Sequence, residues 1–573
     1  NLINFIRGVD TYDQDGDNNT TESIHKLADI YHSNIIIVGP PQAPSEDDGS
    51  INSKNKDSYY RLSNGYKSFK DGGSCGGPCK NRTEVVLAGA NNGILHAFDA
   101  SSNQTNSGTE LWGYIPPILL DKLSTIVTSK TNATNPIYGV DGSPVVKDIY
   151  FDDTSDGTKN PRWRTVLLNG LGAGGKGYFA LDITDINSPE HLFAIENDES
   201  NKIIKHWDKN GSLSEFGYEN GAIDPKYDYR KLGEAWSTPR IIRIKVDGKD
   251  KWVAVFGGGY NGAVNPNVGS AVFVMDLEDE GRLLKVIDIE DTANDIVNSL
   301  PADLSVITAN GTKKANYNGA IVYATDLEGK VTKINLTEDF VIDTDQNSSS
   351  YNSIVRPVAS DKEVHQTTLF TAEATSTNGR YIYTRPEVTI NNDNNLWLYF
   401  GTGNTQKLQS QSSQVKNRLY GIKDKNFPNF VKVSPTGNVS MCKTAPTCPG
   451  GADLGWYVDL KKSQKLTAEP TVHKDRVYFP IYEPTALNNK CGTGLAILRA
   501  FDTKCGNSVL NVNIGKGVLS KVVVQGDNLY IGLAGEANKN IPGFSSKDNL
   551  ITGKSKAKSS NTAVQIESWK ENY

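Results

Sequence analysis

Residues 85–99 read Val-Val-Leu-Ala-Gly-Ala-Asn-Asn-Gly-Ile-Leu-His-Ala-Phe-Asp. This phrase joins two short apolar runs through a turn of small residues that includes Gly, and the second run ends at Asp99. The arrangement is typical of a β-hairpin, because a tight turn between two strands needs residues that tolerate positive φ. A single hairpin cannot bury its apolar face, so the phrase predicts packing against further strands.

Variants of this phrase recur along the chain. The copies run over Val166–Asp182, Trp252–Asp276, Ile321–Leu336, Leu396–Asp424 and Arg476–Asp502, and an incomplete copy begins at Leu529. Repeated hairpins bury their faces by stacking around an axis, so the fold class we expect is all-β, a modified β-propeller of about seven blades with long loop insertions. One ring of this kind is a single domain, which we expect to span residues 1–573.

The composition favours a large all-β protein. The 573 residues include 53 Gly, 24 Pro and 25 Tyr but only 2 Met, and long helical patterns of Ala, Leu, Glu and Lys are scarce. This balance suits short strands with tight turns and argues against a helical bundle. The formal net charge is −6 and the sequence has no basic stripe, so we expect no nucleic-acid partner.

Three segments lie outside the repeated hairpins. Residues 1–39 form an N-terminal segment whose acidic loop leads into the first strand, and the polar residues 40–77 are expected to form a surface excursion. Residues 538–573 are a tail rich in Lys, Ser and Asn, in which residues 563–569 have the pattern of a strand that closes the ring. The chain starts in mid-pattern and shows no signal peptide and no run of eighteen apolar residues, so we expect a fragment of a longer exported protein.

The six cysteines form three pairs that are close in sequence. These pairs are Cys75 with Cys79, Cys442 with Cys448, and Cys491 with Cys505. Each pair lies among Gly, Pro, Asn and Thr residues, a setting typical of local disulfides formed in an oxidising compartment. The alternative for the first pair is zinc, but a Cys-Gly-Gly-Pro-Cys loop without a second Cys or His pair nearby lacks two of the four ligands of a structural zinc site.

Several phrases, taken in order, resemble the C-terminal domain of the PilC/PilY family of type IV pilus biogenesis factors and tip adhesins. The phrases that carry the resemblance are Leu2–Gly8, Asn91–Ala100, Glu110–Pro116, Tyr138–Asp148, Arg164–Asp182, Trp252–Asn261 and Tyr399–Gly403. The resemblance covers most of the chain up to about Gly403 and fades beyond it. Several phrases in a fixed order are more specific than any one of them.

The resemblance implies a modified seven-bladed propeller at the pilus tip, extracellular and associated with the outer membrane. Its implied role is to support pilus extension against retraction, twitching motility and attachment to host cells, often with calcium as a modulator. The implied partners are pilin and minor pilin subunits, a host-cell receptor and the N-terminal region of the same protein.

This sequence departs from the family at the usual calcium loop. Family members place an acidic Asp-x-Asp-x-Asp-Gly loop just before the strand that here reads Ile321–Asp326. In this chain the preceding residues 303–319 carry one carboxylate and two lysines. Because Ca²⁺ takes six to eight oxygen ligands, with several carboxylates among them, we expect no calcium there.

An acidic loop near the N-terminus has the spacing of a calcium-binding loop. Residues 10–22 read Asp-Thr-Tyr-Asp-Gln-Asp-Gly-Asp-Asn-Asn-Thr-Thr-Glu, with Gly16 at the sharp turn and Glu22 six residues later, as in an EF-hand. Ligands at alternate positions converge on one ion, so Ca²⁺ is the expected cofactor. The predicted ligands are Asp10, Asp13, Asp15, Asp17, Asn19 and Glu22.

The first ligand position of this loop departs from the EF-hand pattern. It falls on Thr11, so either Thr11 contributes an oxygen or Asp10 takes its place in a distorted loop. The alternative for the whole loop is a solvated acidic turn without an ion. Against that alternative, four aspartates within eight residues repel one another unless a counter-ion is bound.

The sequence favours a binding function over an enzyme function. Quinone-dependent dehydrogenases are also propellers, and they repeat an Ala-x-Asp-x-x-Thr-Gly-x-x-x-Trp signature in each blade. Here only Ala97–Asp99 with Glu110–Trp112 comes near that signature. The paired carboxylates of a glycosidase cannot be located from spacing, and no Ser, Cys or Asp stands in the context of an activated nucleophile. We therefore predict a binding and assembly protein rather than an enzyme, with the quinone enzyme as the alternative.

Overall fold

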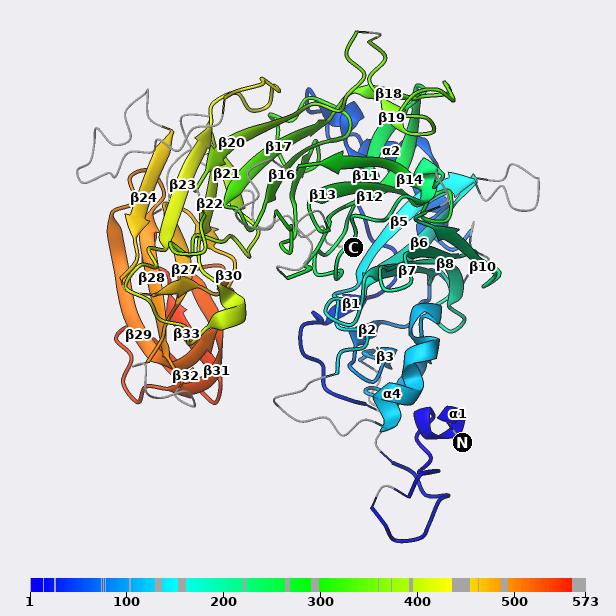
Figure 1. Ribbon diagram of the computed structural model, residues 1–573, viewed down its shortest axis with the longest axis horizontal. Coiled ribbons are helices and arrows are strands. Elements are labelled where there is room, and N and C mark those ends of the chain that lie inside the picture. Colours follow the sequence, from blue (N-terminus) through cyan, green and yellow to red (C-terminus); the bar gives the residue numbers. More distant parts are fainter. Residues whose placement is uncertain are drawn as a thin grey trace.

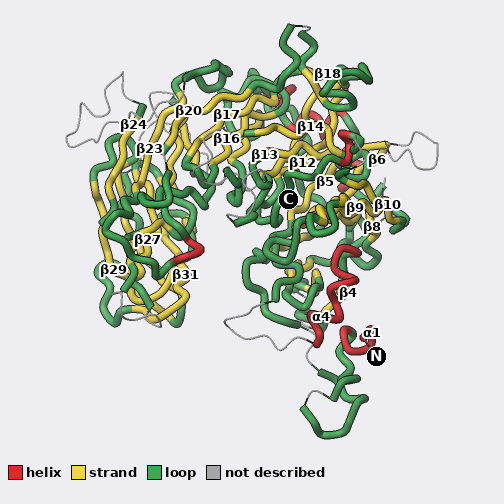
Figure 2. Tube along the Cα trace, viewed as in Figure 1, coloured by secondary structure: helices red, strands yellow, loops and turns green. Residues whose placement is uncertain are grey.

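The computed structural model describes most of the chain. The described residues are 2–13, 15–24, 27–73, 75, 77, 79–102, 105–128, 137–152, 161–219, 223–262, 268–289, 298–358, 360–372, 374–390, 395–434, 454–461, 463–485 and 493–558. Figure 2 shows that strands and loops dominate this part of the chain and that its helices are short. No helix in these ranges is long and apolar enough to cross a membrane.

The strands form six sheets that follow one another in chain order along an arc (Figure 1). We call each repeated hairpin with its flanking strands a blade. Blade one holds β1 (Ile36–Val38), β2 (Val85–Gly89), β3 (Leu95–Asp99) and β4 (Glu110–Tyr114). Blade two holds β5 (Val145–Asp152), β6 (Pro161–Gly170), β7 (Gly177–Asp182), β8 (Glu190–Asp198), β9 (Ile203–Trp207) and β10 (Leu213–Gly217).

Blades three to five continue the pattern. Blade three holds β11 (Arg240–Val246), β12 (Lys249–Gly257), β13 (Ala271–Asp276) and β14 (Leu283–Asp288), and β18 (Asp339–Ile342) with β19 (Ile354–Val355) extends its sheet. Blade four holds β15 (Ser305–Thr308), β16 (Ala320–Thr325), β17 (Lys330–Leu336) and β20 (Gln366–Thr371). Blade five holds β21 (Glu387–Ile390), β22 (Leu396–Gly401), β23 (Arg418–Asp424) and β24 (Gly455–Asp459).

The last sheet contains two blades. Blade six holds β25 (Lys465–Leu466), β26 (Thr471–His473), β27 (Arg476–Glu483), β28 (Leu495–Asp502) and β29 (Ser508–Leu519). Blade seven holds β30 (Val523–Gln525), β31 (Asn528–Ala537), β32 (Phe544–Lys547) and β33 (Leu550–Lys554). Because β29 also pairs with β31, the backbone hydrogen bonds continue from one blade into the next.

The short helices lie between these strands. They are α1 (Leu2–Ile6), η1 (Ser53–Asn55), α2 (Asp57–Ser63), α3 (Tyr66–Lys70), η2 (Pro117–Lys122), α4 (Leu123–Thr128), η4 (Pro225–Tyr227) and η5 (Thr405–Lys407). With so little helix and so many sheets, the predicted all-β propeller class is confirmed.

The predicted hairpins form between the predicted strands. Val85 pairs with Asp99 in blade one, and Val166 pairs with Asp182 in blade two. The terminal aspartate recurs for a local reason. Its carboxylate accepts a hydrogen bond from the backbone N–H two residues later, as in Asp182 with Thr184 at 2.9 Å, and so starts the turn toward the next strand.

The hydrophobic core lies between successive blades. Six buried clusters each join two neighbours, so that Leu87 of blade one packs in the same cluster as Val146 of blade two. Leu498 of blade six and Ile531 of blade seven share the last of these clusters. Each hairpin therefore buries its two faces against the blade before it and the blade after it, as the repetition predicts.

The segment over residues 40–77 differs from the predicted surface excursion. It contains η1, α2 and α3, and the side chains of Tyr66 and Phe69 are fully buried. The ring of Tyr66 lies edge-on to the ring of Trp163, with 4.8 Å between the ring centroids. The polar composition does not indicate this burial, because a few aromatic residues are enough to anchor the segment against the core of blades two and three.

The C-terminal tail also carries more structure than its composition indicates. The strands β32 and β33 form a hairpin over residues 544–554, inside the segment predicted as a tail. The predicted ring-closing strand over residues 563–569 lies outside the described residues.

Candidate metal site

The acidic loop over residues 10–22 is closed at its base by a short antiparallel ladder. Val9 forms a bridge with Ser23, and the backbone N–H of Asp10 donates to the carbonyl of Glu22 at 2.9 Å. The N–H of Ile24 donates to the carbonyl of Gly8 at 3.0 Å. The two ends of the loop, and with them Asp10 and Glu22, therefore lie side by side.

The loop turns where the sequence predicts. Gly16 has φ of +77°, a conformation that glycine adopts without steric cost, and its N–H donates to the carbonyl of Asp13 at 3.3 Å. Asp13 and Asn18 also have positive φ, at +51° and +68°. Asn and Asp tolerate this region better than most residues, so the backbone can coil tightly around its own carboxylates.

Side-chain to backbone hydrogen bonds turn the acidic side chains inward. Asp13 Oδ1 accepts from the N–H of Asn18 at 3.1 Å, and Asp17 Oδ1 accepts from the N–H of Asn19 at 2.7 Å. Asp15 Oδ1 accepts from the N–H of Asp17 at 3.3 Å. These bonds hold one oxygen of each carboxylate near the backbone, while each carboxylate still has further lone pairs for a ligand.

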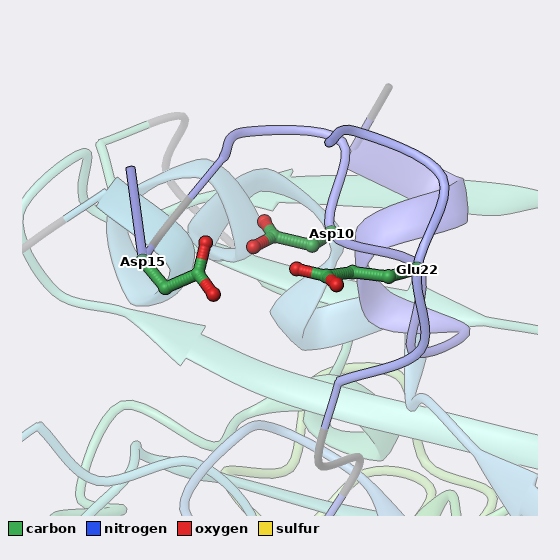
Figure 3. Close-up of side chains that lie close together, drawn as sticks. All are labelled: Asp10, Asp15 and Glu22. Carbon is green, nitrogen blue, oxygen red and sulfur yellow. The ribbon is translucent and has the colours of Figure 1, made fainter. Parts of the chain in front are cut away.

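The structure brings the predicted carboxylates together in two overlapping groups. Asp10, Asp15 and Glu22 form one group, and the three side chains point toward a shared space (Figure 3). Asp13 and Asp17 join Asp15 in the other group. Within each group, one oxygen from every carboxylate lies within 4.8 Å of the others. Asp15 belongs to both groups and therefore lies at the centre of the cluster.

The position of Asp10 bears on the first ligand. The sequence leaves Thr11 or Asp10 as alternatives, and the structure places the Asp10 carboxylate beside Asp15 and Glu22. Asp10 is buried, with 1% of its surface exposed, whereas Asp15 is exposed. Asn19 lies beside the same group, because its Nδ2 donates to Glu22 Oε2 at 3.4 Å. The loop thus combines one buried carboxylate with several accessible ones.

The pKa of Glu22 shows that holding these negative charges close together is unfavourable. The pKa of Glu22 is raised from its ordinary value, first by desolvation and then by the negative charges of Asp17, Asp15, Asp10 and Asp13. Like charges held close together favour the neutral form of one of them. A divalent cation among them would remove this penalty.

The residues of this loop fit calcium. Ca²⁺ takes six to eight oxygen ligands from carboxylates, carbonyls and amides in flexible geometry. Asp10, Asp13, Asp15, Asp17 and Glu22 offer carboxylate oxygens on one short loop. The donor set contains no thiolate or imidazole, the ligands that softer metals prefer.

The loop that precedes β16 is built in a different way. Here the Asn52 side chain, which is 1% exposed, donates from Nδ2 to the carbonyl of Thr312 at 3.1 Å and to the carbonyl of Ala315 at 2.9 Å. The N–H of Asp57 donates to Asn310 Oδ1 at 2.7 Å. Protein donors thus satisfy backbone carbonyl oxygens of this loop.

No sequence pattern points to the roles of Asn52 and Asp57. Asn52 lies 260 residues from Thr312, and no local pattern connects the two. Asp57 is buried and accepts from Lys147 Nζ at 3.0 Å and from Arg243 Nε at 3.1 Å. Burial alone would raise the pKa of Asp57, but the neighbouring positive charges hold it below its ordinary value. Asp57 therefore ties α2 to blades two and three as an ionised carboxylate.

The cysteine predictions are tested in part. Cys75 and Cys79 form a disulfide, as predicted. Cys442, Cys448 and Cys491 lie outside the described residues, and Cys505 is buried next to the end of β28. The two other predicted pairings stay predictions.

The sequence matches a known family and named relatives. Residues 62–440 match the family model described as the PilY1 beta-propeller domain. A type IV pilus biogenesis factor PilY1 homolog of Xylella fastidiosa is 27% identical over 459 residues, which cover 75% of this chain and 27% of that protein. The type IV pilus biogenesis factor PilY1 of Pseudomonas aeruginosa strain UCBPP-PA14 is 26% identical over 431 residues, which cover 74% of this chain and 31% of that protein.

A solved structure supports the fold. The crystal structure of the Pseudomonas aeruginosa PilY1 C-terminal domain superimposes with a TM-score of 0.53 at 20% identity, covering 88% of this chain and 99% of that chain. The curated relatives are longer, since the chain spans 27% to 31% of their length. The family model covers more than half of the 573 residues, and this chain therefore belongs to the PilY1 β-propeller family.

Proposed function

We propose that this chain is the propeller domain of a type IV pilus biogenesis factor that acts outside the cell at the pilus tip. The observation that carries the proposal is the match of residues 62–440 to the PilY1 propeller, together with relatives named as pilus biogenesis factors. The role is one of binding and assembly rather than catalysis. It supports pilus extension against retraction, and with it twitching motility and attachment to host cells.

The partners in this proposal are the pilin and minor pilin subunits at the tip, a host-cell receptor and the N-terminal region of the same protein. Propellers bind partners through the loops between their strands, because a rigid ring holds those loops in fixed positions. Some insertions between the repeated hairpins are long. Two of them contain additional strands, β9 with β10 and β18 with β19. They enlarge the surface over which a partner can be contacted.

Calcium is the cofactor in this proposal, bound by Asp10, Asp13, Asp15, Asp17 and Glu22 with Asn19 beside them. The proximity of the carboxylates and the raised pKa of Glu22 support it. Extracellular calcium is millimolar, so a site with a Kd of about 10⁻⁴ M would be filled outside the cell. The ion would order residues 10–22 and so fix α1 relative to blade one.

The proposal is tested in the bacterium that produces this protein, with the full-length protein lacking only the region described here. We expect few surface pili and little twitching in this strain, and we expect pili to return when retraction is also disabled. A strain with normal numbers of pili and normal attachment would overturn the proposal. Full-length protein with Asp15→Asn and Asp17→Asn tests the role of calcium separately from the role of the domain. These changes remove negative charge from the acidic loop and leave the propeller in place.

A further inference from the structure

A cavity of about 610 Å³ lies at the N-terminal end of the molecule, between α1, blade one and the η2–α4 segment. In Figure 1, α1 lies beside α4 at this end, and the two helices are in contact. Ligand pockets in proteins span about 300–1,000 Å³, so the cavity has the size of a small-molecule site. Its lining includes no residue of the acidic loop over residues 10–22.

The walls of the cavity are mainly aliphatic. The apolar lining consists of Ile3, Ile6, Ile94, Ile115, Leu120 and Leu123. Gly113 on β4 helps to keep the space open, because a Cβ atom at this position would lie 2.9 Å from Ile94 Cγ2 and 3.3 Å from Glu110 Oε1. Such walls favour a hydrocarbon chain over a polar ligand.

The polar groups of the lining differ in what they can offer to a ligand. Glu110 Oε1 is bonded to His96 Nδ1 at 2.6 Å, and the hydroxyl of Tyr114 is bonded to His191 Nδ1 at 2.8 Å. Arg7 is exposed at the cavity, and in the described part of the chain its guanidinium makes no ion pair with a carboxylate. A guanidinium recognises a carboxylate through paired hydrogen bonds.

We propose that this cavity binds a small amphipathic carboxylate, with its aliphatic chain against the isoleucine and leucine side chains and its carboxylate on Arg7. The exposed Arg7 guanidinium and the size of the cavity select this occupant, because the Glu110 carboxylate of the same lining is already bonded to His96. A cationic or neutral chain of the same length would gain the apolar contacts but would lack the ion pair.

The cavity is connected to the acidic loop, and this step rests on the calcium proposed above. Ile3, Ile6 and Arg7 line the cavity, and Asp10 begins the loop three residues later. The N–H of Ile24, just after Glu22, donates to the carbonyl of Gly8. Without calcium, the clustered carboxylates repel a carboxylate ligand at Arg7. With calcium bound, that repulsion is removed and α1 is held in place, so calcium strengthens ligand binding.

The test is calorimetry on the purified chain with sodium octanoate, octylammonium chloride and 1-octanol, at millimolar calcium and again with chelator. We expect octanoate to bind most tightly of the three. The change Arg7→Gln should weaken the binding of octanoate about tenfold and leave the binding of octanol unchanged. The change Ile3→Ser should weaken the binding of both. Ile3 is 67% exposed, so Ile3→Ser is not expected to disturb the fold.

Two results would overturn the proposal. One is that octylammonium binds as tightly as octanoate, and the other is that Arg7→Gln binds octanoate like the unchanged chain. If octanoate binds equally well with calcium and with chelator, the proposed connection to the loop is wrong, but the proposed ligand of the cavity is not contradicted. Calcium titration without octanoate reports separately on the metal site, and pilus counts report on the proposed function, so the three failures are distinguishable.

Discussion

Two loops of this protein collect oxygen atoms in different ways. In residues 10–22 the oxygens are carboxylates with repelling charges, and the loop is closed by its own backbone. In residues 309–319 the oxygens include backbone carbonyls, and the amide of Asn52 donates to two of them. The first loop gathers negative charges that raise the pKa of Glu22, whereas the second is satisfied by hydrogen bonds from a distant segment.

The difference shows two ways in which an oxygen-rich loop can be held in place. A buried amide with two donated hydrogen bonds fixes a loop at any calcium concentration. A carboxylate cluster fixes its loop only when the ion is present, which makes the loop responsive to its surroundings. We therefore expect blade four to be insensitive to calcium and the N-terminal loop to depend on it.

The largest expected effect is a loss of stability when Asp57 is changed. Asp57 lies on the same segment as Asn52, which donates to the loop over residues 309–319. Asp57→Ala removes the carboxylate that Lys147 and Arg243 share inside the protein. Breaking a buried ion pair on one side costs about 3–5 kcal/mol, so the free energy of unfolding in urea should fall by that amount, equally with calcium and with chelator.

The matched control is Asp48→Ala on the same segment. Asp48 pairs with Lys56 at the surface, where solvent screens such pairs and they add little to stability. If Asp57→Ala and Asp48→Ala have the same free energy of unfolding, the buried ion pairs of Asp57 do not hold the segment.

A smaller loss is expected for Asn52→Ala. The change removes the donor of two carbonyls, and leaving buried polar groups unsatisfied costs about 1–3 kcal/mol. Hydrogen exchange should quicken around residues 309–319, and added calcium should not restore protection. Restoration by calcium would contradict the comparison, because it would show that an ion can occupy this loop as well.

Calcium itself should stabilise the chain by a comparable or smaller amount. With a Kd of about 10⁻⁴ M, 1 mM calcium adds about 1.4 kcal/mol to the free energy of unfolding. Asp15→Asn with Asp17→Asn should abolish this increment and abolish calcium uptake in calorimetry.

Asp185→Asn provides the control for the calcium variants. Asp185 Oδ1 also accepts from a backbone N–H two residues later, at 3.0 Å, but Asp185 lies outside the carboxylate cluster. This variant should take up calcium as the unchanged chain does. If the unchanged chain takes up no calcium at millimolar concentration, the loop is a solvated turn.

The smallest effect is the pH dependence of the loop. The pKa of Glu22 is raised above its ordinary value of 4.5, so without calcium the folded chain holds this proton more tightly than the unfolded chain. The contribution of Glu22 to stability is then fully present below pH 4.5 and is lost as the pH rises through the raised pKa.

Protons also compete with calcium at this residue. Calcium affinity should fall as the pH drops toward and below the raised pKa of Glu22, and Glu22→Gln should flatten that dependence while weakening calcium at neutral pH. Calcium titrations at several pH values give the measurement. An identical pH profile in Glu22→Gln would show that the other carboxylates alone set it.

The parts of the fold that depend on local pattern could be predicted from the sequence. The hairpin that ends at Asp99 forms as expected, because alternation and turn residues are local signals. The spacing of Asp13, Asp15, Gly16 and Glu22 likewise predicted a loop that turns at Gly16 and gathers its carboxylates, as the structure shows.

The parts that depend on distant contacts could not be predicted. Burial of residues 40–77 rests on Tyr66 and Phe69 finding a place against blades two and three, and a polar composition hides this. The position of Asp10 beside Glu22 rests on the ladder at the base of the loop. The role of Asn52 rests on carbonyls 260 and 263 residues away, for which a single sequence offers no signal.

The shared ladder of β29 and β31 has a consequence for how the ring comes apart. Five backbone pairs, from Gly515 with Ala537 to Leu519 with Leu533, cross from blade six into blade seven. A force applied to the C-terminal end is therefore transmitted through these bonds into blade six. Blades six and seven should unfold together as one cooperative unit. Blade seven is thus protected from unfolding without blade six.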